Sequence, residues 1–399
     1  MTRSIRASLA VTAAVMPLYV VRWRVGPIPT TLLESAILFT LALYVGALIL
    51  ERGPLPRRTP LDIPIGLFLV AGVIGVFVAP DHRGAVGIFR AYLLEPIAVY
   101  YVGVAVIRRP DDVYRILAVG AIGAAVFAAG EVLTLAHAVI TNRVVLGHVD
   151  AVLGINPNSV ALYLEPLIGL STGFVAFAVG RRRWIAAGLL VLLTLAELAT
   201  LSRGGILALG ALVIGVILTI RSLRLRAAIM AGGIAGAILL TQLPLIGPRL
   251  QHALDPGRGT FDVRGDIWVA TARMLRDHPI FGAGINAYQD TMAPYRKPFP
   301  ILSPEPYPHN IFLTSWTELG ILGMVAFTLI VGILVVRSFR ALPGAAAWAR
   351  PLLWGTGMAF VMVVVHGLVD SPYWKNDLSV EFWILAALAV VAQRAGRET

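Results

Sequence analysis

Two arginines of this 399-residue chain are placed to act on an anionic group. Arg203 lies in "LATLSRGGILALG", between two apolar runs, where a membrane arginine needs an anionic partner or contact with water. Arg264 lies in "FDVRGDIWVATARMLRDHP", near the predicted start of a short helix. A guanidinium group can hold two phosphate oxygens, and a helix N-terminus favours an anion.

A histidine, His309, stands where a proline-rich segment meets an apolar run, in "PEPYPHNIFLTSWTELGILG". Because an unperturbed histidine titrates at about pH 6.5, it is suited to take a proton from a hydroxyl group. We expect the charges of nearby arginines to depress the pKa of His309 and to keep the imidazole neutral.

Each of these residues also has a structural interpretation. Arg203 can be an interfacial loop arginine that reaches lipid headgroups. Arg264 can lie on a solvated helix face, paired with Asp262 or Asp266. His309 can simply begin a helix.

Glu318 lies nine residues after His309, about 13 Å further along a helix. A carboxylate inside a membrane segment is a candidate functional residue. Gly320 and Gly323 nevertheless favour a role in close helix packing. Four weaker candidates are glutamates in other apolar runs, and they leave a proton or ion path open: Glu95, Glu131, Glu165 and Glu197. Asp370, in the predicted last outer turn, is another weaker candidate.

The elements that must position these residues are membrane helices. The chain is 58% hydrophobic and 14% charged, with a mean hydropathy of +0.81, so it is too apolar for an ordinary soluble domain. We predict an all-α polytopic membrane protein that forms a single domain, residues 1–399. Twelve spans are expected near residues 7–21, 31–50, 62–79, 86–107, 113–139, 158–179, 184–201, 204–220, 226–246, 309–336, 351–369 and 378–393.

The distribution of positive charge predicts the orientation. If the N-terminus is cytoplasmic, 19 of the 33 Arg and Lys residues fall in cytoplasmic segments, and only 7 fall in short outer segments. This bias places both termini in the cytoplasm and the long loop, residues 247–308, outside. The net charge of +11 therefore reflects topology, and no nucleic-acid partner is predicted.

The long loop between the ninth and tenth spans has structure of its own. Asp262 is the predicted N-cap of a short amphipathic helix, which ends at His278-Pro279. A glycine turn, "IFGAGINAY", follows, and a series of prolines then stiffens the approach to His309.

Several classes of site are not predicted. The chain has no cysteine, which excludes disulfides and thiolate chemistry. His252, His278 and His309 lack the spacing of metal ligands. There is no Walker A loop, and "GAG" at 282–284 is not a dinucleotide fingerprint. We therefore expect neither a metal nor a cofactor.

The motifs "LSRGGILALG", "VRGDIWVATARMLRDHPIFGAGINAY" and "PHNIFLTSWTELGILG" occur in the order seen in the O-antigen ligase and polymerase superfamily (WaaL/Wzy-like membrane glycosyltransferases). "GINPNSVALYL" and "HGLVDSPYWKNDLSVEFW" are similar to two further family segments. The resemblance covers roughly residues 80–395. It implies a GT-C-like bundle with a large periplasmic loop between helices 9 and 10.

The resemblance also implies an activity and roles. Family members transfer a glycan from undecaprenyl pyrophosphate to an acceptor hydroxyl on the periplasmic side of the bacterial inner membrane. The family arginines match Arg203 and Arg264, which would bind the donor pyrophosphate, and the family histidine matches His309, the expected catalytic base. Supporting roles are expected for Asn158, for Asn310 and for Glu318.

The motifs leave the exact activity open. An O-antigen ligase would pass the glycan to a glycolipid of lipid A–core type, in lipopolysaccharide biosynthesis, with inversion and without a metal. A polymerase would extend another lipid-linked glycan. A secondary transporter, of the bicarbonate type, is the alternative from another class, although the sequence has no inverted repeat.

Overall fold

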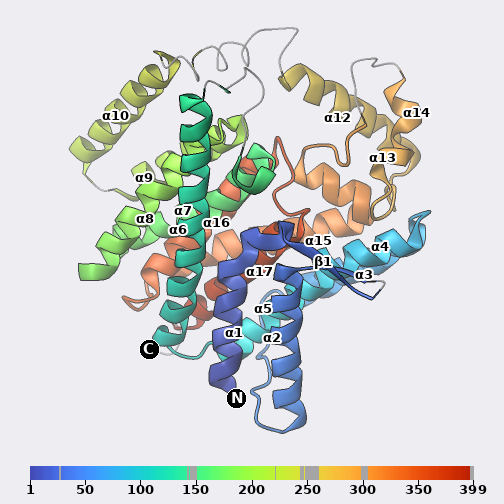
Figure 1. Ribbon diagram of the computed structural model, residues 1–399, viewed down its shortest axis with the longest axis horizontal. Helices are drawn as coiled ribbons and strands as arrows, with labels where there is room; N and C mark the ends of the chain where they lie inside the picture. The colour runs from blue at the N-terminus through green and yellow to red at the C-terminus, as the bar shows by residue number, and fades with distance from the viewer. Residues whose placement is uncertain are drawn as a thin grey trace.

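The computed structural model describes residues 1–26, 28–141, 143, 151–220, 222–242, 247, 260–297 and 304–395, which are mostly helical (Figure 1). The predicted helical class is therefore confirmed. The long helices are α1 (Thr2–Val15), α2 (Leu32–Ile49), α3 (Asp62–Val78), α5 (Glu95–Val106), α6 (Pro110–Ile140), α7 (Pro157–Phe177), α8 (Gly180–Ala199), α9 (Arg203–Thr219), α10 (Leu223–Gln242), α12 (Thr260–Asp277), α15 (Ile311–Ala341), α16 (Arg350–Gly367) and α17 (Asn376–Ala395).

Shorter elements connect them. The helix α4 (His82–Ile88) and the π-helical η2 (Phe89–Leu94) run directly into α5, and α13 (Tyr288–Thr291) and α14 (Ala293–Arg296) follow α12. Two short 3₁₀ helices are η1 (Met16–Val20), which extends α1, and η3 (Val152–Gly154).

Six of the described helical segments are long and apolar enough to cross a membrane: α2, His82–Val106, α6, α7, α15 and α17. Two shorter apolar helices are α3 and α9. Each of the twelve predicted spans overlaps a helical segment, although residues 243–246 of the ninth span lie outside the described residues. The protein is thus consistent with a polytopic helical membrane protein, while twelve crossings remain a prediction.

Two local features differ from the sequence predictions. The connection between α1 and α2 contains an antiparallel hairpin of β1 (Arg22–Val25) and β2 (Ile28–Thr31), because tryptophan, valine, isoleucine and threonine favour strands. In addition, α12 begins at Thr260, so Asp262 lies inside its first turn and is not the N-cap. The predicted end of this helix before Pro279 is correct.

The connections gather at two ends of the bundle. At one end, the Arg394 Nη2 donates to the carbonyl of Arg58 at 2.9 Å, and the Arg6 Nη1 donates to the Asp112 carboxylate at 2.6 Å. The start of α1 and the end of α17 lie at this end, and α12 lies at the other (Figure 1).

The centre of the bundle is formed by α7, α16 and α17, which are mostly buried. α7 packs closely against α16, because a Cβ on Gly173 would lie 2.7 Å from the backbone of Gly355. This contact fixes the start of α16 against the end of α7.

The predicted glycine turn is present and lies between α3 and α15. Ala283 N donates to the carbonyl of Thr317 at 2.7 Å, and Ile285 N donates to the carbonyl of Gly75 at 3.1 Å. The segment after α12 is therefore joined by backbone hydrogen bonds to two bundle helices. Of the predicted proline-rich approach, residues 298–303 lie outside the described residues.

Candidate functional site

The carboxylate of Asp370, in the turn after α16, is the centre of the candidate site. Its Oδ1 lies 3.2 Å from His309 Nδ1. Its Oδ2 lies 3.8 Å from Arg264 Nη2 and 3.5 Å from Asn158 Nδ2. Asp370 is only 3% exposed, so the structure brings residues of α7, α12 and the start of α15 to one buried carboxylate.

His309 is held in a particular backbone conformation just before α15. Its φ of 50° lies in the left-handed region, which a histidine seldom adopts and which is enriched at functional sites. Asn310 caps α15 by accepting from Phe312 N and Leu313 N, and its Nδ2 donates to the carbonyl of Leu368 at 3.0 Å. Asn310 therefore joins the start of α15 to the turn that carries Asp370.

The second ring nitrogen of His309 also has an acidic neighbour. His309 Nε2 lies 3.3 Å from Glu305 Oε2. Burial acts to lower the pKa of His309, but the hydrogen bonds with Asp370 and Glu305 outweigh it and raise this pKa to about 9. The predicted depression of the pKa is therefore wrong, because the hydrogen bonds with two carboxylates outweigh the charge of Arg264.

Asp370 is the charged partner of this histidine. Burial acts to raise the pKa of Asp370, but the hydrogen bond with His309 and the positive charges of His309 and Arg264 hold it below its usual value. The pair is therefore an imidazolium and a carboxylate near neutral pH, with Arg264 beside the carboxylate.

Arg264 projects from the first half of α12 and is 7% exposed. Its side chain is buried and pairs with Asp370, so Arg264 does not lie on a solvated helix face as the structural interpretation expected. α12 also supports the histidine, because the Trp268 Nε1 donates to the carbonyl of Pro308 at 3.0 Å. One amphipathic helix thus positions both a cation and the backbone next to His309.

Arg203 is the first residue of α9, and Ser202 caps this helix by accepting from Gly205 N at 3.3 Å. Burial lowers the pKa of Arg264, and the positive charge of Arg203 lowers it further. The two guanidinium groups therefore lie within electrostatic range of each other. Arg264 and His309, which are far apart in the sequence, thus meet at Asp370, and Arg203 acts on Arg264 through its charge.

Glu318 lies away from this cluster. Its Oε2 accepts from Asn286 N at 2.6 Å, in the glycine turn after α12. Its side chain is buried, and its backbone carbonyl faces Gly75 of α3. Glu318 therefore joins α15 to the inserted segment, as the packing interpretation expected.

Asp370 is the residue that sequence reasoning underrated. The motif "HGLVDSPYWKNDLSVEFW" contains it, but only the position of this motif after an apolar run marked it as an outer turn. Nothing local indicates that His309, Arg264 and Asn158 all reach it. Among the described residues no group of His, Asp and Glu is arranged to hold a metal ion, and His252 lies outside them.

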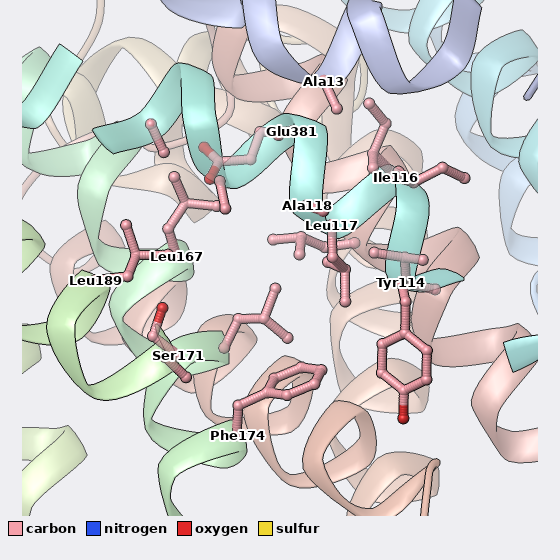
Figure 2. A pocket seen from close by; sticks show the side chains of 18 of the residues that line it. Ala13, Tyr114, Ile116, Leu117, Ala118, Leu167, Ser171, Phe174, Leu189 and Glu381 are labelled. Carbon is pink, nitrogen blue, oxygen red and sulfur yellow. The ribbon is translucent and has the colours of Figure 1, made fainter. Parts of the chain in front are cut away.

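A separate cavity of about 290 Å³ opens between α1, α6, α7, α8 and α17 (Figure 2). Its walls are almost entirely apolar, and Phe174, Leu167 and Leu117 point into it. None of the residues around Asp370 lines this cavity. The polar cluster and the apolar cavity are therefore different places in the bundle.

Two further buried carboxylates have partners inside the bundle. Glu95 pairs with Arg90 at 3.3 Å, and Glu131 accepts from Val152 N at 2.7 Å. These contacts give both residues a structural role.

Comparison with known families agrees with the sequence motifs. Residues 188–328 match a family model described as O-antigen ligase. The resemblance to the O-antigen ligase and polymerase superfamily is thereby confirmed, and it points to a membrane enzyme of that general kind. The matched segment contains Arg203, Arg264, His309 and Glu318, whereas Asp370 lies beyond it. A comparison with curated proteins finds no match.

Proposed function

We propose that this chain, which carries an O-antigen ligase segment at residues 188–328, transfers a glycan from undecaprenyl pyrophosphate to an acceptor hydroxyl. The observation that supports this proposal best is the convergence of Arg264 and His309 on Asp370, with Arg203 in electrostatic range. The cluster combines guanidinium groups for an anionic leaving group with a histidine for a hydroxyl proton.

The two arginines hold the donor. Arg203 and Arg264 bind the pyrophosphate and stabilise the negative charge that grows as the glycosidic oxygen leaves. In this proposal guanidinium groups, and not a metal ion, balance the pyrophosphate charge. Asp370 keeps Arg264 oriented through their 3.8 Å ion pair.

His309 takes the proton of the acceptor. In the fraction of molecules in which His309 has lost its Nε2 proton, Asp370 accepts the Nδ1–H, and the neutral imidazole presents its Nε2 lone pair on the side where Glu305 lies. The acceptor hydroxyl displaces Glu305, gives its proton to Nε2 and bonds to the anomeric carbon. The bond from that carbon to the pyrophosphate oxygen breaks, and the configuration at the carbon inverts.

The proposed location follows from the charge pattern. The site faces the periplasm, and both termini of the multi-pass chain lie on the cytoplasmic side of the bacterial inner membrane. The acceptor is a glycolipid of lipid A–core type in a ligase, or a second lipid-linked glycan in a polymerase.

The test is a reconstituted transfer assay with a lipid-linked glycan donor. The wild-type protein should form product, and His309→Ala should form none while it keeps its thermal stability. Full activity of His309→Ala would refute the assignment of the base. Solute uptake by proteoliposomes without any glycan product would favour a transporter instead.

A deletion strain separates the two activities of the superfamily. Accumulation of free lipid-linked polymer indicates a ligase, because polymerisation then precedes the missing step. Accumulation of single unpolymerised repeats indicates a polymerase.

A further inference from the structure

A second polar cluster lies inside the bundle behind the candidate site, and the proposed mechanism does not use it. It consists of Glu165 on α7, Glu197 on α8 and His366 on α16, which are 0%, 2% and 0% exposed. His366 Nδ1 and Glu165 Oε1 form a hydrogen bond. Buried polar groups in a membrane segment are costly, so their retention calls for a specific role.

His366 supports the turn that begins α9. A Cβ on Gly204, the residue after Arg203, would lie only 2.1 Å from His366 Nε2. A Cβ on Gly205 would lie 1.9 Å from Glu197 Oε1. The first turn of α9 therefore rests directly on the imidazole and on a carboxylate, and no side chain fits between them.

His366 also carries the turn that bears Asp370. Its carbonyl accepts from Asp370 N at 3.0 Å and from Val369 N at 2.9 Å, at the end of α16. One residue thus contacts the start of α9 with its ring and holds the Asp370 turn with its backbone. Its ring orientation is set by Glu165 from a third helix.

We propose that His366, oriented by Glu165, is a positioning residue that fixes the distance between Arg203 and Asp370. Glu197 supports the same turn from the other side of Gly205. The inference rests on the proposed function, in which Arg203 binds the pyrophosphate and Asp370 orients His309. His366 would set how far apart Arg203 and Asp370 lie. His366 itself does not touch the substrate.

The ring of His366 lies against the backbone next to Arg203, so a change of this ring would move the arginine as well as loosen the packing. Since misplacement of about 1 Å can cost on the order of 10²-fold in rate, small shifts of this turn should be visible in catalysis.

The test compares three variants in the full-length reconstituted protein. His366→Ala removes the ring, and His366→Asn keeps an N–H near the position of Nδ1 for Glu165. Gly204→Ala removes no polar group but pushes a methyl group against the ring. Gly210→Ala is the matched control, because nothing lies within 4 Å of a Cβ at this position of the same helix.

Two readouts are needed. The first is kcat and the KM for donor and acceptor. The second is hydrogen exchange at residues 203–206 and 369–371 without substrate, which does not depend on activity. We expect His366→Ala and Gly204→Ala to lower kcat on the order of 10²-fold and to speed exchange at both segments. His366→Asn should recover most of the rate, and Gly210→Ala should match the wild type.

The double variant Gly204→Ala/His366→Ala should be no worse than His366→Ala, because the missing ring makes room for the methyl group. If the wild type lacks transferase activity but the exchange pattern is as expected, the positioning role stands and the proposed function fails. Wild-type kcat and exchange in Gly204→Ala would overturn the inference. So would a His366→Ala protein with normal kcat and exchange at both segments.

Discussion

The carboxylate of Asp370 lies 3.2 Å from His309 Nδ1, although 61 residues separate them in the chain. The same carboxylate lies 3.8 Å from Arg264 Nη2, so one buried acid serves the base and a cation together. This arrangement makes Asp370 the residue on which the geometry of the site depends, and it leads to the first prediction.

Asp370→Asn should lower kcat by roughly 10²-fold or more, which is the usual contribution of an oriented general base. The amide cannot balance the positive charges of His309 and Arg264, and it no longer selects the tautomer with a free Nε2. The measurement is the initial rate of product formation at saturating donor and acceptor. Ser371→Ala, in the same turn, is the control, and a wild-type rate for Asp370→Asn would contradict the assigned role.

Glu305→Gln should shift the pH profile of kcat/KM toward lower pH. In the wild type, activity should rise with pH as His309 loses its proton, because its pKa is raised to about 9 by Asp370 and Glu305. Removal of the Glu305 charge lowers the pKa of His309, so the neutral base forms at a lower pH. A rising limb that stays in place would show that Glu305 does not control this titration.

The sequence predicted the elements better than it predicted the site. Apolar runs long enough to cross a bilayer predicted the positions of the helices. His278-Pro279, in the long loop, predicted the end of α12. The hairpin at Arg22–Thr31 was missed, because short strands between apolar runs have little periodic signal. The resemblance to family motifs identified Arg203, Arg264 and His309 as site residues. The residues around each of them, taken alone, fit a structural role equally well.

The state of His309 was not predictable from the sequence. Glu305 and His309 are close in the chain, but the contact with Asp370 depends on how the start of α15 lies against the end of α16. The predicted neutral imidazole assumed that arginines are its nearest charges. The fold places carboxylates there instead, and this decides the direction of the pKa shift.

Gly320→Ala should destabilise the protein and move Glu318. Gly320 has φ 69° and ψ −178°, which only glycine adopts readily, and a Cβ would lie 2.3 Å from the carbonyl oxygen of Ile280. Strain of this kind costs about 1–3 kcal/mol. The measurement is the apparent Tm in detergent. Gly332→Ala in the same helix meets no neighbour and should be neutral or slightly stabilising.

Arg264→Lys tests whether the site needs the shape of a guanidinium group or only its charge. A lysine keeps the positive charge near Asp370 but offers a point charge in place of a planar fork, so two phosphate oxygens can no longer be held together. We expect the KM for the donor to rise roughly 10-fold, equal to about 1.4 kcal/mol, with little change in the KM for the acceptor. Inhibition by inorganic pyrophosphate should weaken to the same extent. Arg276→Lys, on an exposed turn of the same helix, controls for the substitution itself. Equal changes in the two KM values would mean that Arg264 supports the fold of the site without binding the pyrophosphate.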